Sequence, residues 1–360
     1  MITTIIGIVG AIGLLGLMVF IHELGHFVVA KRNGIVVEEF GFGYPPRLVT
    51  LFEHSGTKYT LNVIPFGGFA RLKGENEIEG PGSFASAPKR VRTVVLVAGA
   101  GMNLVLAVVM LSAAFAVGYP VVGQGALIIE VLEGSAAAEA GLQVGDIILH
   151  IDDYILYRFD DLSPYVKAHP NQVIELGVRR GDDFLLLEAR PQLKEGQGFL
   201  GIAFKPVIRL RRFPWPQALL RGLKLTGQFL WLTLSLPVLL LRGDIPVEVA
   251  RPVGAPGIYQ LASGAMEYAL ASGRWFAVLQ LGGLLNAAVA LTNLLPLPGL
   301  DGGRLLFIVA EAVRGKRVSP DREGTIHAIG MVVLIALMVF ISIQDLVLKV
   351  PLPDWSHFGL

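Results

Sequence analysis

Four stretches of the sequence are long and apolar enough to cross the hydrocarbon core of a bilayer as helices. Such a helix needs roughly 20 apolar residues, and residues 2–30, 91–119, 276–298 and 326–348 each meet that requirement. The composition agrees, because 53% of the 360 residues are hydrophobic and 16% are charged, whereas soluble domains carry about a quarter of their residues as charges. The chain is therefore predicted to be an α-helical polytopic membrane protein with four transmembrane helices in a lipid bilayer.

The residue counts also exclude several kinds of chemistry. The formal net charge is +1, which gives no support to nucleic acid as a partner. The sequence contains no cysteine, so disulfides and thiolate metal ligands are excluded. Any bound metal ion must be held by histidine, aspartate or glutamate, and the chain has seven histidines.

A fifth apolar segment, residues 217–241, carries a polar stripe along one helical face. The stripe consists of Gln217, Arg221, Lys224 and Gln228. Pro237 then interrupts the apolar run. This pattern is typical of a helix that lies in the membrane interface. Residues 214–275 are therefore predicted to form an interfacial helix and a linker.

The loops between the predicted spans indicate the orientation of the chain. Basic residues gather in residues 31–90, and the loop between the last two spans contains Arg314, Lys316, Arg317 and Arg322. Any one of these charges is explained equally well by simple solvation, but cytoplasmic loops carry an excess of Lys and Arg, and both loops agree. We therefore expect both loops in the cytoplasm, with the N-terminus and residues 120–275 outside it.

Two regions outside the spans are rich in strand-forming sequence. Residues 35–74 contain short extended pieces, which we expect to form hairpins that dip into the edge of the bilayer, where their backbone must be paired or face a cavity. Residues 124–206 carry more charges and are predicted to be a soluble α+β module. Its segment GSAAAEAGLQVGDIILHIDD, residues 134–153, resembles a PDZ domain; the alternative is an unrelated small α/β domain. The resemblance implies an extended peptide as a partner.

The first span is interrupted by the sequence His22-Glu23-Leu24-Gly25-His26. Residues four apart on a helix lie on the same face, so His22 and His26 can bind one metal ion, and Glu23 lies where it can take a proton from bound water. Ionisable groups inside a membrane helix are costly and generally functional, which disfavours a purely structural role. The sequence therefore predicts a zinc site, which in catalytic form has three protein ligands and one open position.

The third ligand must be another histidine, aspartate or glutamate. Asp301 follows a Pro-x-Pro-Gly break at the end of the third span and precedes two glycines, a setting in which a carboxylate can turn toward the metal. The alternative is that Asp301 only caps the helix 302–314, a position that favours aspartate. Glu311, Asp321 and His327 are further candidates that lack such a setting.

These motifs, in this order, resemble the site-2 protease family of intramembrane zinc metalloproteases, whose bacterial members carry PDZ domains. The resemblance covers nearly the whole chain and rests on HELGH and on the motif N-x-x-P-x-P-x-x-D-G at residues 293–302. It implies that His22, His26 and Asp301 bind zinc and that Glu23 is the general base.

The resemblance also implies roles in substrate binding. Residues 35–74 are expected to be a membrane-reentrant β-hairpin that presents the substrate as a strand along an edge around 57–63. The residues of that edge are Lys58, Tyr59, Thr60, Leu61 and Asn62. Asn293 of the second motif is expected to help hold the substrate.

Two further parts of the family pattern are incomplete or ambiguous in this chain. A second asparagine commonly lies five residues before Asn293, but Ala288 occupies that position and Asn286 lies two residues earlier, so no role carries over to it. Gly99, Gly101 and Asn103 resemble another family pattern, which close helix packing explains equally well.

The predicted organisation is a membrane core in two halves, residues 1–119 and 276–348, separated by the PDZ domain and the interfacial segment. The predicted function is zinc-dependent hydrolysis of a peptide bond in or near the transmembrane segment of single-span membrane proteins, of the anti-sigma factor or signal-peptide-remnant type. We expect a bacterial inner membrane, with the PDZ domain outside and the active site toward the cytoplasm.

Two questions stay open at this point. The PDZ domain either binds a newly exposed substrate C-terminus or excludes bulky ectodomains, and we expect the filter. The alternative function is a PDZ-bearing membrane scaffold or transporter with a non-catalytic zinc site, which has no use for Glu23.

Overall fold

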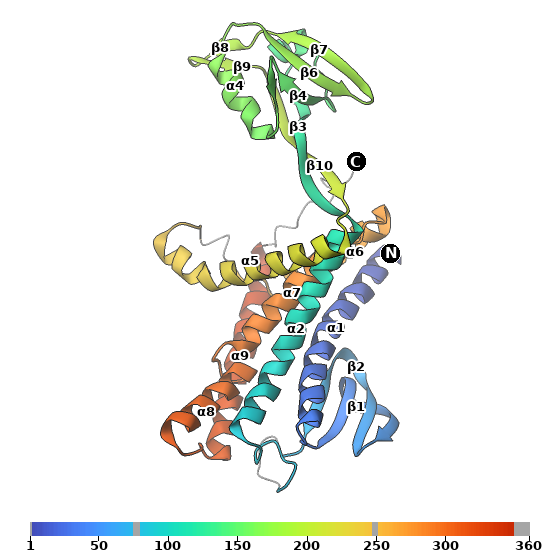
Figure 1. Cartoon of the computed structure of the whole chain (residues 1–360), viewed down its shortest axis with the longest axis vertical. Helices are drawn as coiled ribbons and strands as arrows, with labels where there is room; N and C mark the ends of the chain where they lie inside the picture. Colours follow the sequence, from blue (N-terminus) through green and yellow to red (C-terminus); the bar gives the residue numbers. More distant parts are fainter. Residues whose placement is uncertain (1, 75–79, 247–250, 349–360) are drawn as a thin grey trace. The chain divides into compact units, whose positions relative to one another are not determined.

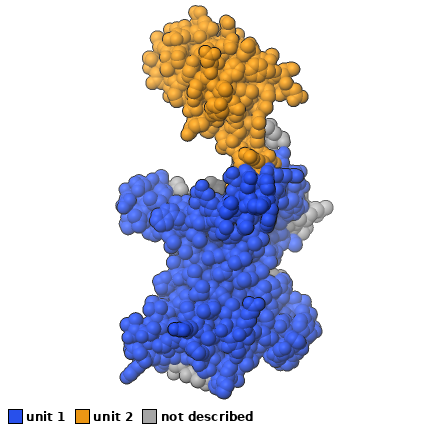
Figure 2. Space-filling model, in the orientation of Figure 1, with its two compact units in different colours: residues 1–118, 212–356 blue, residues 119–211, 357–360 orange. Residues whose placement is uncertain are grey.

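The described residues fold into two compact units. The computed structural model describes residues 2–74, 80–246 and 251–348. One unit, here called the membrane unit, comprises the chain up to Gly118 and from Arg212 onward, and the other comprises Tyr119–Arg211 (Figure 2).

Long helices dominate the membrane unit. They are α1 (Ile2–Arg32), α2 (Lys89–Gly118), α5 (Trp215–Arg242), α6 (Ala255–Ser272), α7 (Phe276–Leu294), α8 (Asp301–Arg314) and α9 (Pro320–Leu348). In the described part of the chain, five helices are long and apolar enough to cross a membrane: Gly7–Arg32, Lys89–Gly118, Trp215–Arg242, Phe276–Leu294 and Arg322–Leu348. Four of them overlap the predicted spans, and the fifth is α5. Figure 1 shows α5 running across α2 and α7, which it contacts, rather than alongside them.

Helix α2 is the centre of the membrane unit, because it packs against α1, α5, α7 and α8. Small residues permit these close contacts, as is usual where helices associate in lipid. A side chain at Gly25 of α1 would collide with the carbonyl group of Ala98 in α2, and one at Gly283 of α7 would collide with Leu111. The histidine-bearing part of α1 is thus held directly against α2.

Strands β1 (Val37–His54) and β2 (Thr57–Leu72) form an antiparallel sheet beside α1 (Figure 1). Both strands are long and irregular in register, so that residues 39–42 pair with 58–61 on one side and with 68–71 on the other. Residues 58–61 also pair with 49–53. Because each strand bends back on itself, the sheet consists of four paired segments, in the order 68–72, 37–42, 57–62 and 47–54.

This pairing corrects one prediction. The segment 57–63 was expected to be an edge strand, yet residues 58–61 have paired neighbours on both sides. Their side chains are also engaged, since Thr60 donates to Glu39 over 2.9 Å and Asn62 donates to the Gly43 carbonyl over 2.9 Å. Among the described strands, the two edges of this sheet are 68–72 and 47–54.

The second unit is a small α+β domain, here called the PDZ-like domain. Its six-stranded sheet has the order β10-β3-β4-β6-β7, with β5 paired to β4. The strands are β3 (Tyr119–Val131), β4 (Ile147–Ile151), β5 (Tyr154–Ile155), β6 (Ile174–Arg180), β7 (Asp183–Ala189) and β10 (Ile202–Arg211). The short elements are α3 (Ala136–Glu139), a 3₁₀ turn (Phe159–Asp161), α4 (Leu162–Ala168) and the hairpin β8 (Gln192–Lys194) with β9 (Gln197–Phe199).

The PDZ-like domain has a hydrophobic core of its own. Its fully buried members include Ile128, Ile148, Leu156, Leu162 and Leu176. The domain extends beyond the predicted limits 124–206 because β3 and β10 continue to pair as far as Tyr119 and Arg211.

Candidate active site

Helix α1 supplies the two histidines predicted to bind metal. His22 and His26 lie one turn apart, as their spacing requires, and both are buried. Their Nε2 atoms lie 3.1 Å from each other. Both imidazoles therefore direct their Nε2 atoms toward one common position.

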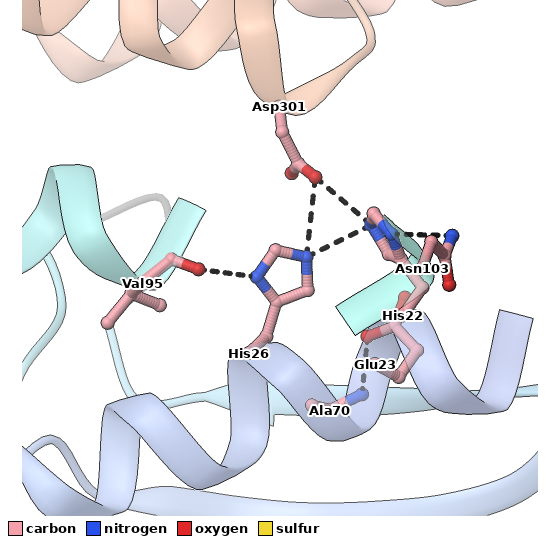
Figure 3. A network of polar contacts seen from close by, with 7 residues as sticks. All are labelled: His22, Glu23, His26, Ala70, Val95, Asn103 and Asp301. Carbon is pink, nitrogen blue, oxygen red and sulfur yellow. Dashed lines mark hydrogen bonds and ion pairs between the residues drawn. The ribbon is translucent and has the colours of Figure 1, made fainter. Parts of the chain in front are cut away.

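Asp301 reaches this spot from the other half of the membrane unit. Its Oδ2 lies 3.0 Å from His22 Nε2 and 3.3 Å from His26 Nε2 (Figure 3). It is the first residue of α8, and α7 ends before it at Leu294 because Leu295, which precedes Pro296, is extended. The glycines that follow, Gly302 and Gly303, pack so closely on the backbone of 294–298 that a side chain would collide with it.

The turn that carries Asp301 is anchored to α9. The backbone N–H of Gly299 donates to His327 Nδ1 over 2.9 Å. Gly330, one turn further along α9, lies against Pro298 where a side chain would clash with the backbone. Two contacts on one side of α9 therefore fix the approach of the Asp301 carboxylate.

The other candidate ligands do not join the site. Glu311 pairs with Arg92 at 2.7 Å and so joins α8 to α2, and His327 is engaged with Gly299. The side chain of Asp321 lies outside the described residues. Among the described His, Asp and Glu residues, His22, His26 and Asp301 are the group whose ligand atoms converge, all within 4.8 Å of one another.

Glu23 lines the same cavity as the two histidines and also contacts the β-sheet. Its Oε2 accepts a hydrogen bond of 3.1 Å from the backbone N–H of Ala70, in the edge segment 68–72 (Figure 3). The carboxylate of the predicted base is thus held against the 68–72 edge of the sheet.

One face of α2 closes the site behind the histidines. The carbonyl group of Val95 accepts a hydrogen bond of 2.8 Å from His26 Nδ1, and Asn103 Nδ2 lies 3.4 Å from His22 Nδ1 (Figure 3). Between them, Gly99 leaves room for the rings: an added Cβ would contact His26 Nε2 and lie 2.8 Å from His22 Nε2.

A cavity of about 410 Å³ opens onto these groups. His22, Glu23, His26 and Asp301 line it, together with the predicted substrate residue Asn293. Its lining does not include Lys58, Tyr59, Thr60, Leu61 or Asn62.

Tyr44, Ala70 and Arg304 also line the cavity and were not predicted. Arg304 has a sequence signal, since it lies one helical turn after Asp301 and so shares its face. Ala70 contributes through its backbone, for which the sequence gives no signal.

The donor set suits zinc. Two imidazole nitrogens and one carboxylate oxygen are ligands that zinc accepts, and three protein ligands leave a position open, as in catalytic sites. Burial by itself raises the pKa of Asp301, but hydrogen bonds from the two imidazoles outweigh burial and hold that pKa below the usual carboxyl range. An anionic carboxylate is the form in which aspartate binds a metal ion.

Comparison with known proteins decides the family. The sequence model of peptidase family M50 matches residues 10–337. The chain belongs to peptidase family M50. This is the site-2 protease family, so the chain is a zinc-dependent metalloendopeptidase with several membrane-spanning helices.

Relatives of this M50 peptidase match it along most of its length. A protein of Clostridium perfringens that is named after the zinc metalloproteases is 30% identical, over 92% of this chain and 96% of its own. The zinc metalloprotease RasP of Geobacillus kaustophilus is 27% identical, over 96% of this chain and 99% of its own. A PDZ domain of Listeria monocytogenes, of known structure, is 21% identical over 23% of this chain and 90% of its own, with a TM-score of 0.22.

The close approach of Gly99 to both imidazoles gives a prediction for this M50 peptidase. Gly99→Ala places a methyl group against the two rings, so we expect zinc affinity to fall by about tenfold or more. Zinc content after dialysis against a graded chelator measures the change.

Gly101→Ala is the matched control on the same helix, because an added Cβ there meets nothing within 4 Å. It should bind zinc as the wild type does. Equal zinc affinity for both alanine variants would show that zinc binding does not depend on the space that Gly99 leaves for the imidazole rings.

Proposed function

We propose that this M50 peptidase hydrolyses a peptide bond in or near the transmembrane segment of single-span membrane proteins, and that His22, His26 and Asp301 hold its zinc. The observation that carries the proposal is the position of the converging side chains: two of the three, and the neighbouring Glu23, lie within an apolar helix long enough to span a membrane. Anti-sigma factors and signal-peptide remnants are the substrate types that we infer.

Bound zinc supplies Lewis acidity, which polarises a carbonyl group and makes water a nucleophile near neutral pH. Glu23 takes the proton of the attacking water and passes it to the nitrogen of the leaving amine as the peptide bond breaks. The hydrogen bond from Ala70 keeps the Glu23 carboxylate at the strand edge, where the substrate carbonyl must arrive.

The alternative of a scaffold or transporter with a non-catalytic zinc site is less well supported. Structural zinc sites are closed by four protein ligands, whereas three His, Asp and Glu side chains converge here in the described structure. A cavity beside them and a carboxylate within reach of it are features that catalysis needs and a scaffold does not.

We further propose that the substrate binds as an added strand along 68–72. This segment is an edge of the sheet and lines the cavity at Ala70 and Leu72. A helical substrate hides its carbonyl groups in its own hydrogen bonds, and pairing with an edge strand holds the peptide extended. The proposal moves the substrate from the expected segment 57–63, which lies inside the sheet, to the edge segment 68–72.

The orientation that we propose has the active site toward the cytoplasm of a bacterial inner membrane, the PDZ-like domain outside, and α5 in the outer interface. It is supported by the basic loops at residues 31–90 and 314–322. The end of α1, the start of α2 and the end of α8 border these loops and lie at one end of the membrane unit, while α5 crosses the other end (Figure 1). Because the chain has no cysteine, single cysteines introduced at Lys316 and Leu193 report the sidedness directly, and labelling of both from the same side would contradict it.

Glu23→Gln is the decisive variant for the reaction. The amide keeps the size of the side chain but cannot take a proton, so we expect cleavage of a single-span test substrate by the purified protein to fall by about a hundredfold or more. Zinc content should stay near that of the wild type, since Glu23 is not among the converging ligand atoms.

Zinc analysis of both proteins is the internal control of this experiment. Cleavage that survives Glu23→Gln would show that another group is the base. Equal zinc with no cleavage by either protein would favour the scaffold.

Strand addition predicts a dependence on the conformation of the substrate. A substrate with a Gly-Pro pair near the scissile bond should be cleaved at least several-fold faster than one with Leu-Leu, because less helix must be undone. Rates are compared in the same detergent at subsaturating substrate. Equal rates would mean that the substrate is not extended before cleavage.

The PDZ-like domain offers a groove for a peptide. Strand β10 is an edge strand, and a hollow of about 180 Å³ lies between it and α4, lined by Leu162, Val166, Ile202 and Phe204. An edge strand beside an apolar hollow is the arrangement that binds an extended peptide by strand addition. This feature favours peptide binding over the expected filter.

One deletion separates the two roles. Tyr119 and Arg211 are paired neighbours, so a short Gly/Ser linker can replace residues 119–211. Peptide binding predicts a higher KM for substrates with a free apolar C-terminus. The filter predicts instead that substrates with intact ectodomains become cleavable, and that outcome would contradict binding as the main role.

A further inference from the structure

Three positions of α2, at intervals of four residues, face the histidine pair. Val95, Gly99 and Asn103 lie on one face of the helix, as His22 and His26 do on α1. Val95 and Asn103 contact one Nδ1 atom each, and Gly99 makes room for the rings (Figure 3). The two helices therefore meet along a matched pair of stripes.

The two Nδ1 atoms must donate hydrogen bonds once the metal is bound. Both Nε2 atoms point toward Asp301 and so serve as the ligand atoms. A neutral imidazole that binds metal through Nε2 carries its proton on Nδ1. His26 meets this condition, because its Nδ1–H donates to the Val95 carbonyl oxygen.

His22 has only the Asn103 amide to receive its Nδ1–H in the described structure. Asn103 is fully buried, and its Oδ1 has no hydrogen-bond partner while its Nδ2 faces His22 Nδ1. In that arrangement two N–H groups would oppose each other. Which amide atom is oxygen is assigned from the surrounding network, and a half-turn of the amide brings the unpaired oxygen onto the Nδ1–H. The rotation replaces two opposed N–H groups by an N–H···O hydrogen bond.

We infer that Asn103 is a positioning residue for the zinc site, whose Oδ1 accepts the His22 Nδ1–H and so fixes the tautomer and ring orientation of that ligand. The inference rests on the proposed ligation of zinc by His22, His26 and Asp301. Loss of a group that hydrogen-bonds to a metal ligand weakens metal binding by about 10–100-fold.

Burial of an asparagine in this helix bundle is not enough to produce such a contact. Asn286 of α7 is also fully buried with an unpaired Oδ1, but its Nδ2 donates to the Gly282 carbonyl of its own helix over 2.8 Å. It neither contacts the histidines nor lines the cavity. Asn286 is therefore a matched control for the loss of a buried amide.

The test measures zinc affinity in the purified full-length protein by competition with a chromogenic chelator. Asn103→Leu, similar in size and without an acceptor, should weaken zinc binding about 10–100-fold. Asn103→Asp keeps an oxygen for the Nδ1–H and should stay within about threefold of the wild type, since carboxylates take this role in zinc sites. Asn286→Leu should bind zinc as the wild type does.

Each other outcome overturns the inference. Wild-type affinity in Asn103→Leu would mean that Asn103 only fills space. Equal weakening in the Leu and Asp variants would mean that the amide acts as a donor. Asn103→Ala is carried in parallel, with thermal unfolding in excess chelator, so that a loss of folding is separated from a loss of zinc.

His26→Ala separates this inference from the proposed ligation. If His26→Ala binds zinc as tightly as the wild type, the ligation itself is wrong. If His26→Ala loses zinc and Asn103→Leu does not, only the role of Asn103 fails.

Discussion

The structure depends on one constraint: polar groups placed among apolar helices must find partners there, because water does not supply them. His22 and His26 meet this constraint through α2 on one side and Asp301 on the other. Glu23 meets it through the backbone of the β-sheet. The contacts that remove the cost of burying these side chains are the same contacts that aim them, so stability and function of the site have a common origin.

The sequence predicted the parts of the site that follow from local spacing. The interval of four between the histidines determines that they share a face, and the Pro-x-Pro-Gly break determines that α7 ends before Asp301. Length and apolarity predicted four spans, and each of them overlaps a helix long and apolar enough to cross a membrane. The PDZ-like domain was predicted partly because charged residues become frequent again after the second span. Its ends were not predicted, because β3 and β10 stay paired as far as Tyr119 and Arg211 through residues that give no sequence signal of a boundary.

What the sequence could not provide was the pairing of distant backbone. The segment 57–63 was expected at an edge, yet it lies inside the sheet because β1 is long enough to fold around it and pair on both sides. Ala70 acts through its N–H group, which every residue except proline has. Asn103 was visible as a polar residue in a span, but its relation to His22 arises only when α1 and α2 are docked.

The separation of the three proposed zinc ligands along the chain has a consequence for biogenesis. Two of them occur in the first span and the third lies 279 residues after His22, on a turn that is held by α9. A nascent chain that has inserted its first span carries the two histidines and Glu23 but not Asp301. If zinc is held as proposed, the protease therefore gains its activity only when the last helix has been made and packed.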